Sequence, residues 1–251
     1  MLLEDKNAVI YGAGGSIGGA AARAFAREDA KVHLAGRTLE SLEEVAGQIR
    51  SAGGVAETAQ VDAIDEQAVD QHADAVVASA GGIDVSFNLI SVGDVQGTPL
   101  AEMPLEDFEQ PIMTAVRTQF LTSRAAARHM ISQGSGVILF FGGYGNPVPD
   151  YYIGGFQVAL NAIESVRRQL ASELGAQGMR AVTLQTGGVP ETIPESFAGR
   201  EQITEGIAGS NILKRAATLE YVGNVAAFVA SDHARTMTAT ALNISCGAIV
   251  D

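Results

Sequence analysis

Short apolar runs alternate with helical patterns of apolar residues along most of the chain. Each run is short enough to form one strand buried on both faces. Strands of this kind, separated by helices, form a parallel sheet that is covered by helices on each side. We therefore predict a single α/β domain with a doubly wound, Rossmann-type, seven-stranded parallel sheet. The predicted strands are residues 8–11, 31–35, 56–60, 85–89, 137–141, 181–185 and 242–244.

Four segments have the spacing of helices that pack one face against such a sheet. We expect Thr38 to cap the second of them through its side chain. Residues 186–217 contain prolines and several glycines instead of a helical pattern. A connection of that length in a compact domain is usually functional, so we predict an irregular lid over a site. The four predicted helices are residues 17–28, 38–50, 105–132 and 156–174.

The balance of charges narrows the classes of partner. The chain of 251 residues has 29 acidic and 16 basic side chains, a net charge of −13 at pH 7. Such a field repels phosphate backbones, so we expect no nucleic-acid partner. The N-terminus does not resemble a signal peptide, and no apolar stretch is long enough to span a membrane. Cys246 is the only cysteine, which excludes an internal disulfide. We expect a cytoplasmic protein without a membrane partner.

A glycine-rich turn directly follows the first predicted strand. Residues 12–18 read Gly-Ala-Gly-Gly-Ser-Ile-Gly, and a predicted helix begins within them. Glycine lets the backbone approach a pyrophosphate closely, and the exposed N–H groups at the helix start attract its negative charge. The position between a strand and a helix is the context that this motif requires. We expect a dinucleotide to be held by Gly12, Gly14, Ser16, Ile17 and Gly18.

The residue that follows the second strand indicates which dinucleotide is bound. Domains that bind NAD(H) place an acidic residue here, on the ribose 2′-hydroxyl, whereas an arginine accommodates the 2′-phosphate of NADP(H). This chain has Gly36 and Arg37, so we predict NADP(H) in preference to NAD(H). Asp62 follows the third strand, where we expect it to hold the adenine edge. Asn88 ends the fourth strand, beside the expected cleft.

Motifs along essentially the whole chain resemble those of the short-chain dehydrogenase/reductase family. The resemblance implies a Rossmann-type oxidoreductase with a nicotinamide cofactor, with Val189 at the cofactor and with a dimeric or tetrameric assembly. The matching segments are residues 11–18 (the family's Thr-Gly-x-x-x-Gly-Ile-Gly), 173–180 (Glu-Leu-Gly…Gly-Ile-Arg), 186–189 (Pro-Gly-x-Ile/Val), 230–232 (Ala-Ser-Asp) and 242–247 (Ile-Asn-Val-Asp-Gly-Gly).

The departures from the family are as informative as the matches. Ser16 replaces the middle glycine of the turn, which is similar to the divergent enoyl-acyl-carrier-protein reductase branch. Family members donate a proton from a Tyr-x-x-x-Lys pair, but alignment to Glu-Leu-Gly places Phe156 and Leu160 there. The catalytic serine falls on Gly143 and the asparagine on Ala115. The chain contains no Tyr-x-x-x-Lys pair at all, so a shifted register does not restore one.

Other polar residues near the expected cleft are candidates for the missing chemistry. Tyr144 and Tyr152 could donate a proton or hydrogen-bond an oxyanion. The alternative is that they line a pocket wall or a subunit contact. The four histidines have no carboxylate or cysteine at metal-ligand spacing, so we predict no metal site. The lesser candidates are Asp94, Asp150, Tyr151, Gln157 and Glu191.

Two classes of function follow from these residues. In the first, an NADP(H)-dependent oxidoreductase reduces a carbonyl or an activated double bond, with a proton from a nonstandard residue or water. In the second, the chain binds the cofactor without ordinary redox activity, as a pseudo-enzyme or for redox-neutral chemistry. The preserved cofactor motifs favour the first. In that class the substrate is a small molecule, and the apolar composition of residues 186–217 suggests that it is apolar. The long helices favour a homo-oligomer.

Overall fold

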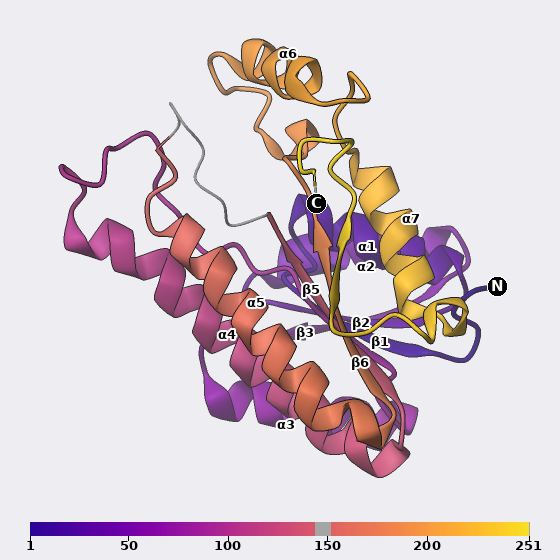
Figure 1. The fold of residues 1–251 in the computed structure, drawn as a ribbon. Helices are drawn as coiled ribbons and strands as arrows, with labels where there is room; N and C mark the ends of the chain where they lie inside the picture. The colour runs from indigo at the N-terminus through magenta and orange to yellow at the C-terminus, as the bar shows by residue number, and fades with distance from the viewer. Residues whose placement is uncertain (144–151, 251) are drawn as a thin grey trace.

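The computed structural model describes residues 1–143 and 152–250, and these contain one seven-stranded sheet (Figure 1). The strand order is β3-β2-β1-β4-β5-β6-β7, and all neighbouring strands are parallel. The chain winds outward in both directions from β1 and β4, so the predicted doubly wound sheet is confirmed. The strands are β1 (Asn7–Tyr11), β2 (Lys31–Gly36), β3 (Val55–Gln60), β4 (Val85–Asn88), β5 (Gly136–Gly142), β6 (Met179–Gln185) and β7 (Thr240–Asn243).

Helices cover both faces of the sheet and bury a separate apolar cluster on each (Figure 1). Alternate residues of β1 face opposite ways: Ile10 belongs to one cluster, while Val9 and Tyr11 belong to the other. Among the described residues no helix is both long and apolar enough to cross a bilayer. The first face carries α1 (Ser16–Arg27), α2 (Leu39–Ser51) and α7 (Leu219–Ala230), and the second carries α3 (Glu66–Ala80), α4 (Leu105–Gln133) and α5 (Phe156–Leu174). Short 3-10 helices are η1 (Gly175–Gln177), η2 (Pro190–Thr192) and η3 (Asp232–Ala234).

One local prediction was confirmed in part, and another was wrong. Thr38 is the N-cap residue of α2, as predicted, but its side chain makes no capping hydrogen bond, and its carbonyl accepts one from Ser41 Oγ at 2.9 Å. Residues 186–217 are not irregular throughout, because they contain η2 and the helix α6 (Arg200–Ser210). None of the residues of α6 is buried. The helix therefore lacks the apolar stripe from which a helix is recognised in a sequence.

Two hydrogen bonds connect the 186–217 segment to neighbouring elements, one near each of its ends. Glu191 Oε2 accepts a hydrogen bond from the backbone N–H of Leu219 at 2.5 Å, at the point where α7 begins. Leu213 donates its backbone N–H to the carbonyl of Cys246 at 3.1 Å. Between these ties, α6 stands at the end of the molecule that Figure 1 shows uppermost. Glu191 therefore serves the backbone of α7, and the role of the segment as a lid stays a prediction.

Candidate functional site

The glycine-rich turn is fitted tightly between β4 and α2. Gly12 has a φ of +76°, and a Cβ atom there would lie 2.5 Å from the carbonyl oxygen of Leu89. A Cβ atom on Gly18 would lie 2.2 Å from the carbonyl oxygen of Gly12. A Cβ atom on Gly14 would lie 2.3 Å from Ser41 Oγ. The backbone can make these approaches only where there is no side chain.

The start of α1 is suited to an anion. The helix begins at Ser16, its N-cap residue is Gly15, and its first turn contains no acidic residue. The first N–H groups of a helix have no partner within the helix, and the helix dipole adds positive potential there. Ser16 is exposed and Ile17 is half-buried at this point. The residues present therefore fit the pyrophosphate of a dinucleotide.

The pairing of β2 with β3 brings Arg37 and Asp62 to one edge of the sheet. Gly36 pairs with Gln60, and Gln60 Nε2 donates to the Arg37 carbonyl at 2.9 Å. The Arg37 side chain is exposed, and its guanidinium makes no hydrogen bond or ion pair within the described part of the chain. Asp62 is exposed and uses Oδ1 to accept the N–H of Ile64 at 3.3 Å. An exposed guanidinium and an exposed carboxylate thus follow two paired strands at the same edge of the sheet.

The side chain of Asn88 and the backbone carbonyl of Val189 form hydrogen bonds with nearby residues. Asn88 is buried, its Nδ2 donates to Thr122 Oγ1 at 3.2 Å, and its Oδ1 accepts from the Ile90 N–H at 3.1 Å. Val189 is buried, and its carbonyl accepts the N–H and the hydroxyl of Thr192 at 2.9 and 2.8 Å. Direct contact of either residue with a cofactor remains a prediction.

The four positions aligned with the catalytic residues of the family contain apolar side chains or glycine. Ala115, Leu160 and the half-buried Phe156 belong to the same apolar cluster beneath α4 and α5. Leu160 lies over the end of β5, where a Cβ atom on Gly143 would be 3.3 Å from its Cδ1. An apolar wall therefore stands where the family would carry its proton donor and lysine.

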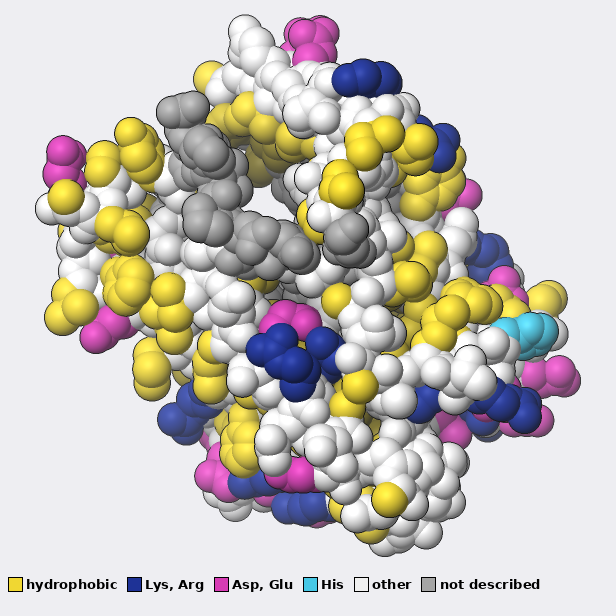
Figure 2. Space-filling model, in the orientation of Figure 1, with side chains coloured by type: hydrophobic (Ala, Val, Ile, Leu, Met, Phe, Trp, Pro, Cys, Tyr) yellow, Lys and Arg dark blue, Asp and Glu magenta, His cyan; other side chains and the backbone are white. Residues whose placement is uncertain are grey.

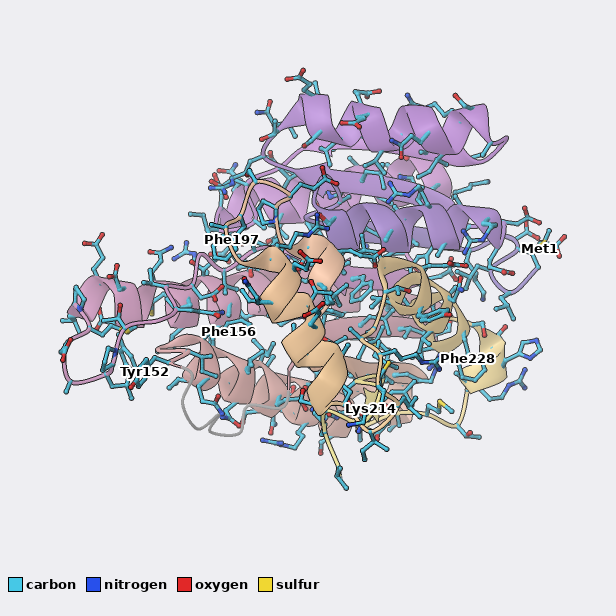
Figure 3. The ribbon with its side chains drawn as sticks, turned by 90° about the horizontal axis from the view of Figure 1, so that it is seen from above. Met1, Tyr152, Phe156, Phe197, Lys214 and Phe228 are labelled. Carbon is cyan, nitrogen blue, oxygen red and sulfur yellow. The ribbon has the colours of Figure 1, made fainter. Side chains whose placement is uncertain are left out.

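Of the tyrosine candidates, only Tyr152 lies within the described residues. Tyr144 lies outside the described residues, as do Tyr151 and Asp150. Tyr152 is exposed, and its carbonyl accepts the N–H of Gly97 at 2.7 Å. In the view of Figure 3, Tyr152 lies farther from the centre of the molecule than Phe156 does. Its role as a proton donor stays a prediction.

A buried polar pair beneath the turn was missed in the sequence. Tyr11 occupies the position of the family's threonine, and its hydroxyl lies 3.3 Å from Nδ1 of His72 on α3. Burial raises the pKa of Tyr11 above its ordinary range and lowers the pKa of His72 to about 4. Both groups are therefore neutral at neutral pH. The helix that carries His72 was not among the predicted ones, so no sequence signal joined the two residues.

The doubly wound sheet and the glycine turn define a dinucleotide-binding protein of the Rossmann class. A family model described as "Enoyl-(Acyl carrier protein) reductase" matches residues 12–248. The chain belongs to the short-chain dehydrogenase/reductase family of oxidoreductases, whose cofactor is NAD(H) or NADP(H). The family resemblance drawn from the motifs is thereby confirmed.

Individual relatives agree with this assignment. The uncharacterized oxidoreductase YxbG of Bacillus subtilis is 30% identical over 242 residues, 94% of this chain and 88% of that protein. Gluconate 5-dehydrogenase of Gluconobacter oxydans is 27% identical over 229 residues, 91% of this chain and 89% of that protein. A short-chain type dehydrogenase/reductase from Mycobacterium marinum has a TM-score of 0.87 at 26% identity, covering 99% of this chain and 97% of that chain. These likenesses favour an oxidoreductase over a redox-inactive protein.

Proposed function

We propose that the chain is an NADP(H)-dependent oxidoreductase that reduces a carbonyl or an activated double bond of a small apolar molecule. The observation that carries the cofactor choice is Arg37, whose exposed guanidinium has no side-chain partner in residues 1–143 and 152–250. It directly follows β2, where Gly36 precedes it in place of the acidic residue that would hold a ribose 2′-hydroxyl. A free guanidinium there is the group that a 2′-phosphate requires.

The site favours an activated double bond over a simple ketone. The cofactor, when bound, supplies a hydride from its nicotinamide ring. The N–H groups at the start of α1 would hold its pyrophosphate, and Phe156 and Leu160 would contribute apolar side chains to the substrate side of the site. Reduction of a ketone needs an acid at the carbonyl oxygen, and neither residue has a proton to give. Reduction of an activated double bond needs only a hydrogen bond to the developing charge, with a proton taken from water.

An apolar substrate is supported by exposed apolar side chains on the segments that follow β4, β5 and β6. Phe197 and Ile203 of the 186–217 segment are exposed, and so are Val95, Leu100 and Tyr152 on the opposite side. Figure 2 shows hydrophobic side chains gathered at the outer end of α4 and again beside α6. Exposed apolar groups that face a site favour a ligand of the same kind.

The cofactor choice is tested with a matched pair of arginine variants. Arg37→Glu should weaken NADPH binding by roughly 10- to 100-fold, because a charge-assisted hydrogen bond is replaced by repulsion. Binding of NADH should be unchanged or tighter. Arg168→Glu makes the same change of charge on the exposed side of α5 and should alter neither affinity. Fluorescence titration measures both cofactors, and an unchanged NADPH affinity in Arg37→Glu would overturn the choice.

We also propose that the chain forms a homo-oligomer through α4. Met113, Phe120 and Ile131 are exposed on this helix, and the separations of seven and eleven residues put them on one face. An exposed apolar stripe on a long helix is suited to a second copy of the same helix.

A further inference from the structure

At the end of β7, residues 243–249 fold back on themselves, and we call this segment the C-terminal hook. Asn243 Oδ1 accepts hydrogen bonds from the backbone N–H of Ser245 at 3.1 Å and from its hydroxyl at 2.6 Å. The Ser245 hydroxyl oxygen in turn accepts the N–H of Ile249 at 3.0 Å, and Asn243 Nδ2 donates to the Ile249 carbonyl at 2.8 Å. Ser245 is 1% exposed. Two side chains therefore hold the hook in shape, with the Ser245 hydroxyl between its two ends.

The far end of the segment that carries α6 is bonded to the hook. Leu213 donates its backbone N–H to the carbonyl of Cys246 at 3.1 Å, and Ile212 donates to the carbonyl of Gly247 at 3.4 Å. A Cβ atom on Gly247 would lie 2.6 Å from Cβ of Ile212, so the chain fits closely against the hook there. The two hydrogen bonds hold residues 212–213 in place directly after α6.

The near end of the same segment also touches the hook. Gly187 follows β6, and a Cβ atom on it would lie 2.2 Å from Cβ of Ala248. The next residue, Gly188, lies against α6, because its own Cβ position is 3.3 Å from Cδ1 of Ile207. In the view of Figure 1, the yellow end of the chain lies below α6. The hook thus contacts the segment where it leaves the sheet and again where it returns from α6.

The hook is also packed beside the cofactor turn. Ile244 and Cys246 pack, together with Ile17 of the glycine-rich turn, against an apolar cluster that contains Val189. By contrast, α6 buries none of its residues. An element that buries little is held by what fixes its ends, so the hook is well placed to determine where α6 lies relative to the cofactor.

We propose that Ser245 is a positioning residue for substrate binding: its hydroxyl keeps the hook folded, and the folded hook holds the α6 segment over the substrate. This inference rests on the proposed function and names what fixes the predicted lid. Without the hydroxyl, the N–H of Ile249 loses its acceptor and Asn243 Oδ1 loses one of its donors, so the hook loosens. The segment then keeps its hydrogen bond from Leu219 to Glu191 but loses its support at residues 212–213.

Amide hydrogen exchange, followed by mass spectrometry, tests this inference without a substrate. In Ser245→Ala, peptides that cover residues 200–213 should exchange about 10-fold faster than in the wild type, because local opening there becomes easier. Peptides from β1 and β5 should exchange at the wild-type rate. Unchanged exchange over residues 200–213 would overturn the inference.

The matched control is Ser231→Ala. Ser231 is also buried, at the end of α7, where its hydroxyl donates to the Phe228 carbonyl at 2.7 Å and accepts the N–H of His233 at 3.2 Å. Its loss should lower the Tm much as Ser245→Ala does, yet leave exchange over residues 200–213 unchanged. Equal acceleration in both variants would show a general loss of stability and would overturn the role of Ser245.

A second variant breaks the contact without altering the hook. Leu213 is 57% exposed, and Leu213→Pro removes the N–H that bonds to the Cys246 carbonyl. Exchange over residues 200–213 should accelerate as it does in Ser245→Ala. If Ser245→Ala does not fold, this variant decides the question: wild-type exchange in Leu213→Pro would show that the hook does not hold the segment.

Kinetics separate this inference from the proposed function. With NADPH and 2-cyclohexenone, Ser245→Ala should raise KM about 10-fold and change kcat by less than about 2-fold, because the groups at the reacting atoms are untouched. A wild-type protein that oxidises NADPH with no carbonyl or unsaturated carbonyl compound contradicts the proposed function, and the exchange experiment still decides the role of the hook. An active wild type, with the same KM in Ser245→Ala, contradicts only the role of Ser245.

Discussion

Leu160 and Gly143 are complementary neighbours at the end of β5. A Cβ atom on Gly143 would lie 3.3 Å from Cδ1 of Leu160, which is closer than an ordinary contact. Leu160 aligns with the lysine of the family, and Gly143 aligns with its serine. The absence of a side chain at Gly143 makes room for the side chain of Leu160. The two departures are therefore coupled through packing.

Because the two positions are packed together, restoring the lysine of the family at position 160 alone should destabilise the fold. Leu160 is 6% exposed, so Leu160→Lys places an amine against apolar neighbours and should lower the free energy of unfolding by roughly 3 kcal/mol. The volume-conserving control Leu160→Met should lower it by less than about 1.5 kcal/mol. Urea unfolding measures both. Equal stability of Leu160→Lys and the wild type would show that position 160 is open to solvent.

Two glycine-to-alanine changes should have different effects: the first should abolish NADPH binding, and the second should stabilise the fold. Gly18→Ala puts a methyl group 2.2 Å from the Gly12 carbonyl oxygen, so the turn must shift and NADPH binding should be lost. Gly47→Ala, inside α2 with nothing within 4 Å of its Cβ position, should stabilise the fold by about 1 kcal/mol. Thermal unfolding and cofactor titration measure the pair. NADPH affinity unaffected by Gly18→Ala would contradict the placement of the cofactor.

Stability should rise with pH through the titration of His72. Burial lowers its folded pKa from 6.5 to about 4, with the nearby His33 as a smaller cause. The unfolded state therefore takes up a proton at a pH where the folded state does not. The stabilisation is complete above pH 6.5 and is lost as pH falls toward 4, an effect of about 3 kcal/mol.

Urea unfolding across that range measures the effect. His72→Leu should flatten the dependence but not abolish it, because burial also lowers the pKa of His33. Within the described residues, the other titratable groups that face His72 are Tyr11, which is neutral there, and His33 itself. An unchanged pH dependence in His72→Leu would mean that His72 is accessible to protons in the folded state.

The oligomer predicted from α4 should depend on Phe120. This side chain is 51% exposed, and Phe120→Glu places a carboxylate in the middle of the apolar stripe. Sedimentation should show a smaller species for Phe120→Glu than for the wild type. Gln133→Glu, at the far end of the same helix, would not serve as a control, because its amide bonds to Ile83. Ser132→Glu adds the same charge at an exposed position of α4 outside the stripe and should leave assembly intact.

The strands of the sheet could be predicted from the sequence, because short apolar runs bounded by polar residues are typical of buried strands. The seven strands lie within two residues of the predicted bounds at each end, and the helix at 156–174 matches α5. Three helices were missed. Two of them have weak stripes: α6 buries nothing, and α3 buries only Val69, His72, Ala73 and Val76. The third, α7, was missed although it buries six residues, because apolar and small side chains occupy most of its positions and leave no distinct stripe.

The parts of the candidate site that depend only on neighbouring residues in the chain could be predicted from the sequence. The glycines of the turn and Arg37 are read from local sequence, because a turn and a strand end fix their surroundings. Two other features depend on which elements meet in space: the pairing of Tyr11 with His72, and the burial of the Gln157 amide without a hydrogen bond in the described part of the chain. No spacing in the chain expresses those contacts.

The hydrogen bond from Leu219 to Glu191 has a consequence for how this protein can diverge. It closes the base of the segment that carries α6, and that helix buries none of its residues, so the sheet and the turn do not depend on α6. Doubling the length of a closed loop costs only about 0.6 kcal/mol. Insertions, deletions and new side chains can therefore accumulate there while the cofactor cradle is inherited unchanged. A lineage built on this chain can change what it acts on without rebuilding how it holds its cofactor.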